Sequence, residues 1–177
     1  LNGIKYAVAR KANILLGSFG VYGKADTLIC DAFRTAAESG MLVVASAGND
    51  GKDLKGDKFP TSCRHPNIMV VTSTDKNKAL ASFASYSFQY VDLASPGVDI
   101  PAVDHTGYGT TISGGSAASA VAAGVAALVW SHHPEYKASD VKEALIRSSF
   151  RNRSLAGKVL SNGLINAYEA IRLDMGL

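Results

Sequence analysis

Two short segments of the chain carry residues suited to acyl-transfer chemistry. Ser116 follows Gly114 and Gly115 and opens a long run of small apolar residues, where the positive end of a helix dipole would support a nucleophile. Asn49 follows Ala47-Gly48 after an apolar stretch, and its side-chain amide could donate a hydrogen bond to a developing oxyanion. These residues predict half of an acyl-transfer site, because the sequence shows no clear base and orienting acid to complete it.

Each of the two residues also has an ordinary structural interpretation. A serine ahead of a helix is most often its N-cap, and an asparagine before Asp50-Gly51 is typical of a turn. The run around Ser116 is not the G-x-S-x-G elbow of the α/β-hydrolases, because Ala118 stands where that motif needs its second glycine. The sequence therefore argues against a lipase-like hydrolase.

The elements that would position these residues alternate along the chain. Short apolar runs predict four strands, at residues 13–16, 41–45, 68–71 and 91–94. Helical patterns are expected at residues 3–12, 25–36, 116–131, 139–148 and 167–173. This alternation predicts an α/β fold with a parallel sheet and right-handed crossovers. The segment Ser18-Phe19-Gly20 then follows the first strand, either as a plain turn or as extended backbone that pairs with a peptide.

The predicted helix at residues 116–131 is small and apolar on every side. That composition predicts a helix that is buried all round. Its longest apolar stretch, residues 120–130, is too short to span a bilayer, so we expect no membrane span. We expect Ser139 to be the N-cap of the surface helix that follows.

Length and composition limit the class of protein. The 177 residues suffice for one domain or most of one, and a chain with 47% hydrophobic and 19% charged residues is typically globular. The net charge of +3 comes from scattered Lys and Arg, which gives no basis for nucleic-acid binding. The four histidines and two cysteines show no metal-ligand spacing. For Cys30 and Cys63 we favour two unpaired packing residues, with a disulfide as the alternative.

Three of these segments, in this order, resemble the subtilisin family of serine proteases. The family carries a Ser-Leu-Gly type segment, an Ala-Gly-Asn segment and the nucleophile run Gly-Thr-Ser-Met-Ala-Ser-Pro-His-Val-Ala-Gly. The matching segments here are Ser18-Phe19-Gly20, Ala47-Gly48-Asn49 and the run from Gly114 to Gly124. Four further segments are similar to family segments, at residues 59–62, 82–86, 93–97 and 163–167. The similarity therefore runs nearly end to end.

The resemblance implies a fold, an activity and roles for particular residues. The whole chain, residues 1–177, would be part of a three-layer, parallel-sheet peptidase domain that hydrolyses polypeptides in the secretory pathway or outside the cell. Ser116 would be the nucleophile and Asn49 the oxyanion donor. Family members need no cofactor and can bind structural calcium, but no calcium ligands are readable in this sequence. The residues implied to pair with substrate backbone are Ser18, Phe19 and Gly20, and those implied to line the pocket for the residue before the scissile bond are Ser46, Ala47 and Gly48.

Two departures from the family pattern bear on activity. The family's catalytic Asp and His segments precede the region matched here, and His65, His105, His132 and His133 match no catalytic position. The chain opens at Leu1 in what looks like the middle of a helix, so we interpret it as a fragment or a processed product. Within the nucleophile run, four residues differ from the family's Thr, Met, Pro and His: Gly115, Ala117, Ala120 and Val121.

These departures leave two hypotheses about function. The first is an endopeptidase whose Asp and His segments lie outside this chain, with Gly115 lacking the hydroxyl that the family places near the oxyanion. The second is an inactive homologue that serves as a peptide-binding or regulatory module. In either case the missing segments would leave the strand at residues 13–16 as a bare apolar edge and would uncover part of the helix at residues 116–131. We therefore expect the isolated chain to self-associate or to need the missing segment.

Overall fold

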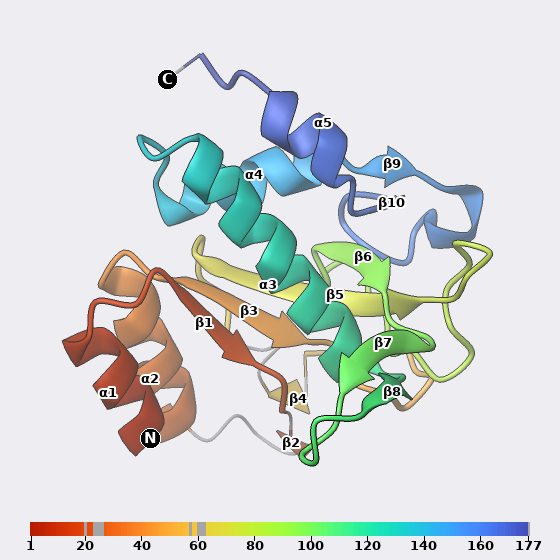
Figure 1. The fold of residues 1–177 in the computed structure, drawn as a ribbon, viewed down its shortest axis with the longest axis horizontal. Coiled ribbons are helices and arrows are strands. Elements are labelled where there is room, and N and C mark those ends of the chain that lie inside the picture. Colours follow the sequence, from red (N-terminus) through yellow and green to blue (C-terminus); the bar gives the residue numbers. More distant parts are fainter. Residues whose placement is uncertain (20, 23–26, 57, 60–62, 177) are drawn as a thin grey trace.

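A central sheet with helices on both faces forms the molecule, as the computed structural model in Figure 1 shows. The structure describes residues 1–19, 21–22, 27–56, 58–59 and 63–176. One face of the sheet is covered by α1 (Asn2–Ala9) and α2 (Thr27–Glu38). The other face is covered by α3 (Gly115–His132), α4 (Ala138–Arg147) and α5 (Ala167–Arg172). The predicted three-layer α/β fold is confirmed.

The main sheet has six strands in the spatial order β1-β3-β5-β6-β10-β9. All neighbours are parallel except β10 and β9, which are antiparallel. The four predicted strands are the first four of this order and are confirmed with shifts of a few residues. The strands of this sheet are β1 (Ile14–Gly17), β3 (Leu42–Ser46), β5 (Ile68–Thr74), β6 (Leu93–Pro96), β10 (Gly163–Leu164) and β9 (Phe150–Arg151).

Four further short strands lie outside the main sheet and were not predicted. β2 (Val21–Tyr22) pairs with β4 (Lys58–Phe59), and β7 (Ile100–Val103) pairs with β8 (Gly109–Ile112), both antiparallel. A two-residue strand is too short to show a pattern in sequence. In the β7–β8 hairpin, β7 alternates only between half-buried and exposed residues and β8 is exposed throughout, so the strong apolar pattern of a buried strand is missing.

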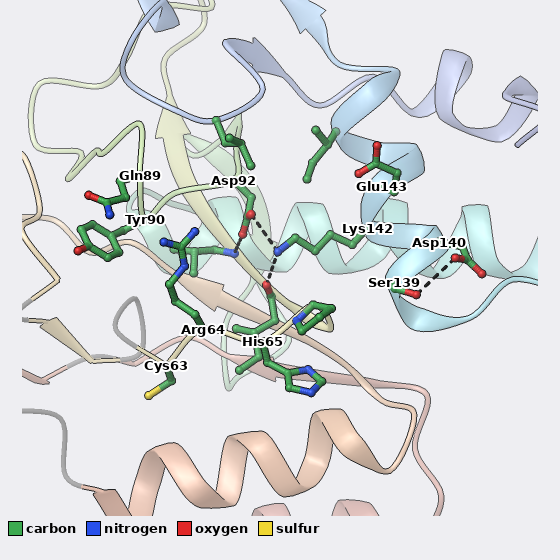
Figure 2. Close-up of a pocket in the computed structure, with 15 residues that line it drawn as sticks. Cys63, Arg64, His65, Gln89, Tyr90, Asp92, Ser139, Asp140, Lys142 and Glu143 are labelled. Carbon is green, nitrogen blue, oxygen red and sulfur yellow. Dashed lines mark hydrogen bonds and ion pairs between the residues drawn. The ribbon is translucent and has the colours of Figure 1, made fainter.

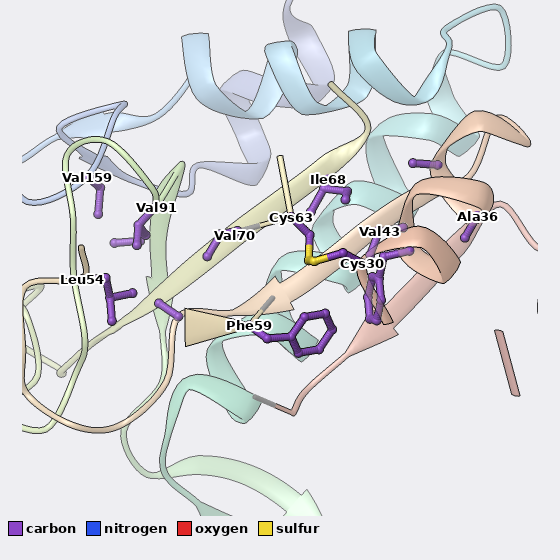
Figure 3. Packing of buried hydrophobic residues seen from close by; sticks show 14 of the residues in the cluster. Cys30, Ala36, Val43, Leu54, Phe59, Cys63, Ile68, Val70, Val91 and Val159 are labelled. Carbon is purple, nitrogen blue, oxygen red and sulfur yellow. A yellow bond between two sulfur atoms is a disulfide. The ribbon is translucent and has the colours of Figure 1, made fainter. Parts of the chain in front are cut away.

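The central strands are continuously apolar because both of their faces are buried. Every residue of β3 and β5 is buried, and their side chains alternate between the two helical layers. Val43 and Val70 point into the core beneath α1 and α2, which Figure 3 shows at close range. Val44 and Val71 point into the core beneath α3 and α4. This double core fixes the positions at which the strands end.

Cys30 and Cys63 form a disulfide, so the expectation of two unpaired cysteines is wrong. The bond joins α2 to the segment that leads into β5, with 5.3 Å between the two Cα atoms (Figure 3). The two cysteines come together because α2 and the segment before β5 pack in the same core, on one face of the sheet. That contact depends on the tertiary fold, and no local pattern in the sequence reports it.

The helix α3 is buried on one side only, so the prediction of burial all round is wrong. Its buried stripe repeats about every four residues and lies against β1, β3, β5 and β6. On the opposite side Ala120, Gly124, Ala127 and Leu128 are exposed, and Leu128 is 55% exposed. Small apolar residues in sequence do not tell a covered face from an uncovered one. The part of the chain that the structure describes does not cover this side of α3.

The length of α3 also changes the argument about membranes. By length and composition alone, its 18 residues could cross a membrane, unlike the shorter run considered from sequence. Core helices of soluble proteins often share that length and composition, and the buried stripe of α3 packs on the sheet.

The start of α4 also differs from the prediction. Its N-cap is Lys137, whose backbone N–H donates to the Asp140 carboxylate at 2.8 Å. Ser139 lies inside the first turn and donates to Asp140 instead of capping the helix. The sequence offers two polar side chains near the helix start, Ser139 and Asp140. In the structure the Asp140 carboxylate, at the third helical position, is the one that accepts from the N-cap backbone N–H.

Candidate active site

The segments that resemble the family motifs meet where β1 and β3 end and α3 begins. Ser18 follows β1, and Ala47 to Asn49 follow β3; the two strands are parallel neighbours with Gly17 opposite Ala45. The turn before α3 is held by a hydrogen bond from the Gly114 N–H to the Gly97 carbonyl at 2.7 Å. The carboxyl ends of parallel strands are where α/β sheets bind ligands, so this is the place to look for chemistry.

Ser116 is exposed at the start of α3 and is not its N-cap. The N-cap is Gly114, and the Ser116 hydroxyl donates to the Ser18 carbonyl oxygen at 3.0 Å. Behind it, the Ser18 and Ser119 hydroxyls are hydrogen-bonded to one another at 3.0 Å, and Ser119 donates to the Ser116 carbonyl. The end of β1 and the first turn of α3 therefore hold Ser116 in place, with its hydroxyl at the surface.

Asn49 is fixed against the same turn through its side-chain oxygen. Asn49 Oδ1 accepts a hydrogen bond from the Gly115 N–H at 2.7 Å. This contact assigns the amide orientation, because only the oxygen can accept, and no described residue accepts from Nδ2. Asn49 does not have the positive φ that favours asparagine in tight turns; Gly48 has it, at 101°. The side chain, rather than backbone strain, therefore explains an asparagine here.

The other implied substrate-contact residues differ in exposure. Phe19 is 51% exposed, and its ring packs near those of Phe33 and Phe59, with centroids 5.8 and 5.9 Å away. Gly20 lies outside the described residues. Ser46 and Ala47 are buried and Gly48 is half-buried, so Gly48 presents the most surface of these three.

Within the described residues, no histidine reaches the Ser116 hydroxyl. His133 stacks on Tyr136 and its Nε2 lies 2.8 Å from the Ile171 carbonyl oxygen. His65 Nδ1 accepts from the Asn67 N–H at the opposite end of β5. The described residues also contain no group of three or more His, Cys, Asp or Glu placed to hold a metal ion. The structure thus brings Ser116 and Asn49 together without a base.

A cavity of about 600 Å³ lies at the other end of the sheet and shares no residue with the Ser116 site. Figure 2 shows the Lys142 ammonium group inside it, 2.9 Å from the Asp92 carboxylate and 2.6 Å from the Ile68 carbonyl oxygen. Asp92 also accepts from the Val70 N–H at 2.7 Å. This ion pair ties α4 to β5 and to the segment before β6. No local pattern in the sequence indicates this ion pair, because Lys142 and Asp92 come from separate elements.

Comparison with known proteins places the chain in a family. The model of the subtilase family matches residues 1–167, and the chain belongs to this family. It is 33% identical over 172 residues to thermitase of Thermoactinomyces vulgaris, across 97% of this chain and 58% of thermitase. It is 31% identical over 170 residues to the thermostable alkaline protease of Halalkalibacterium halodurans, across 95% of this chain and 44% of that protein.

Solved structures of proteases share the fold. The prenylagaramide maturation protease PagA superposes with a TM-score of 0.84 and 28% identity, across 97% of this chain and 65% of PagA. A mutant protease domain of PatA superposes with a TM-score of 0.82 and 26% identity, across 97% of this chain and 62% of that domain. The chain spans about half the length of the curated relatives it matches.

Proposed function

We propose that this chain carries the nucleophile half of a subtilisin-like serine endopeptidase. The observation that carries the proposal is the hydrogen bond from the Gly115 N–H to Asn49 Oδ1 at 2.7 Å. It holds the Asn49 amide beside the turn that presents Ser116, with Nδ2 left to donate. A side-chain N–H fixed beside a nucleophile is the arrangement that stabilises an oxyanion.

In this mechanism the Ser116 Oγ attacks the carbonyl carbon of a peptide bond. The new Oγ–C bond forms as a base takes the serine proton, and the carbonyl oxygen gains the negative charge that Asn49 Nδ2 stabilises. The C–N bond then breaks, the amine leaves with a proton from the protonated base, and an acyl-enzyme remains. Water hydrolyses the ester by the same steps in reverse. The base and its orienting acid are supplied from outside residues 1–177.

The isolated chain is expected to be inactive. The Ser116 hydroxyl donates to the Ser18 carbonyl oxygen, which cannot take up the proton, so the serine stays neutral and is a poor nucleophile. A base must therefore approach Ser116 from the open side and replace this hydrogen bond.

The substrate is a polypeptide whose extended backbone lies along the segment that follows β1. Ser18, Phe19 and Gly20 pair with its backbone, and Ser46, Ala47 and Gly48 line the pocket for the residue before the scissile bond. The Cys30–Cys63 disulfide supports a secretory or extracellular location, because such bonds persist in oxidising compartments.

The alternative is an inactive member of the family that binds extended peptides. It is favoured by the hydrogen bond of Ser116 to Ser18, which uses the nucleophile as a structural group, and by Gly115 in the nucleophile run. The two functions differ in whether Ser116 ever becomes reactive.

Reaction with a fluorophosphonate tests the proposal. A longer form of the protein that supplies the histidine and aspartate should form an adduct at Ser116, found by mass spectrometry, and the 177-residue chain should not. Ser116→Ala is the control for site, and Asn49→Ala should slow labelling by about 10²-fold or more. If the longer form stays unlabelled but binds peptides, the binding module is the correct function. Rapid labelling of the 177-residue chain would place the base within it.

A further inference from the structure

Ser46 lies beside the turn that presents Ser116, and its hydroxyl is hydrogen-bonded within the bend after β3. It is the last residue of β3 and is only 5% exposed. Ser46 Oγ accepts a hydrogen bond from the Gly48 N–H at 3.1 Å, across the bend that ends in Asn49. This contact fixes the backbone from which the Asn49 side chain projects.

Gly115 has no side chain because Ser46 occupies the space for one. A Cβ atom built on Gly115 would lie 2.2 Å from Ser46 Oγ, a distance that no pair of non-bonded atoms tolerates. Its next neighbours would be Asn49 Oδ1 at 3.3 Å, a slightly tight contact, and the Gly48 nitrogen at 3.4 Å, an ordinary one. Gly115 is not among the residues with positive φ, whereas Gly114 has φ 137°. The contact with the Ser46 hydroxyl, and not the backbone conformation, therefore disfavours a side chain at 115.

We infer that Ser46 is a positioning residue of the proposed active site and that it takes over the place of a side chain at residue 115. This inference rests on the proposed function of Ser116 and Asn49. A Cβ at 115 would lie 3.4 Å from the Gly48 nitrogen, so a threonine hydroxyl there could accept the Gly48 N–H as Ser46 Oγ does now. Serine at 46 with glycine at 115 provides one hydroxyl beside the Gly48 N–H. Alanine at 46 with threonine at 115 would provide an equivalent hydroxyl there.

The contact between Ser46 and Gly115 changes how the glycine at 115 bears on activity. The sequence suggested that glycine in place of the family's threonine removes a hydroxyl from the site. The structure places the Ser46 hydroxyl within 2.2 Å of where the β-carbon of that threonine would be. The glycine at 115 therefore goes together with the serine at 46, and it does not by itself indicate an inactive enzyme.

Exchanging the two residues in the 177-residue chain tests the inference without any need for activity. Gly115→Ala should lower the melting temperature, and Ser46→Ala in the same chain should restore it, because the atom at 2.2 Å is removed. Ser46→Ala alone should speed exchange of the Gly48 amide hydrogen about five- to tenfold, since its acceptor is lost. Ser46→Ala/Gly115→Thr should restore slow exchange, whereas Ser46→Ala/Gly115→Ala should not.

Ser161→Ala, which removes another buried hydroxyl that accepts the N–H of the residue two positions on, Gly163, at 3.2 Å, is the matched control and should leave Gly48 exchange unchanged. Additive melting shifts, or unchanged Gly48 exchange in Ser46→Ala, would overturn the inference. In a form that reacts with fluorophosphonate, labelling should slow about tenfold in Ser46→Ala and recover in Ser46→Ala/Gly115→Thr. If no form reacts at all, the proposed function fails, and the melting and exchange data still decide the role of Ser46.

Discussion

Replacing Lys142 by Met should destabilise the fold strongly, although Lys142 lies far from the proposed active site. The ammonium group contacts the Asp92 carboxylate at 2.9 Å and the Ile68 carbonyl oxygen at 2.6 Å, and the two side chains are only 16% and 14% exposed. Methionine keeps the apolar stem but leaves the Asp92 carboxylate with the Val70 N–H as its only hydrogen-bond partner among the described residues. Breaking a buried pair costs about 3–5 kcal/mol, and residual solvent access lowers our expectation to about 2–4 kcal/mol.

Urea unfolding and thermal melting of the 177-residue chain measure this loss. A loss of 2–4 kcal/mol corresponds to a melting temperature about 5–12 °C lower for a chain of this size. Glu143→Gln, at an exposed carboxylate beside Lys142 in α4, is the control and should change stability by less than about 0.5 kcal/mol. Adding Asp92→Asn to Lys142→Met should recover much of the loss, because the buried charge is gone. Equal stability of Lys142→Met and Glu143→Gln would refute the reasoning.

Three further predictions concern other parts of the chain. The 177-residue chain should self-associate, because Leu128 on α3 and Leu16 on the edge strand β1 are 55% and 43% exposed; light scattering should show this, and Leu128→Lys should weaken it. Reducing the Cys30–Cys63 bond, which closes a separation of 33 residues, should cost about 3–4 kcal/mol in unfolding experiments. Hydrogen bonds from the Thr106 hydroxyl and N–H lower the pKa of Asp104, so its stabilisation of the β7–β8 turn should be present above the unfolded-state pKa and lost as pH falls through the folded-state pKa. Carboxyl NMR titration checks the Asp104 pKa, and an unshifted value would contradict the prediction.

The parts of the fold that sequence could predict are those with a continuous local pattern. β3 and β5 are apolar at nearly every position because both faces are buried, and that pattern locates them from sequence. β9 and β10 have two residues each, which is too few for any pattern. The Cys30–Cys63 bond and the exposed side of α3 depend on which surfaces meet in the tertiary fold, and the composition of each segment is the same either way.

The candidate site also combines residues that a local sequence pattern predicts with residues whose role depends on tertiary contacts. Ser116 and Asn49 could be predicted because each belongs to a short contiguous run of recognisable residues. The role of Ser46 could not, because it depends on a contact with Gly115 between the end of β3 and the start of α3. Read alone, each of these residues suggests something different: a pocket-lining serine and a missing hydroxyl. Their proximity shows that a departure from a family motif should be weighed with the residue that faces it in space.

The contacts of Ser116 also indicate how an active site could be divided between segments of a longer protein. In the proposed site, Ser116 and Asn49 are both oriented by hydrogen bonds within this chain, to Ser18 and from Gly115. They therefore need no base to hold their geometry. The exposed side of α3 and the edge strand β1 lie next to them, and a segment that covers these apolar surfaces would gain burial energy at the same place where the base is needed. Packing of that segment would then position the base, and reactivity of Ser116 would depend on its docking.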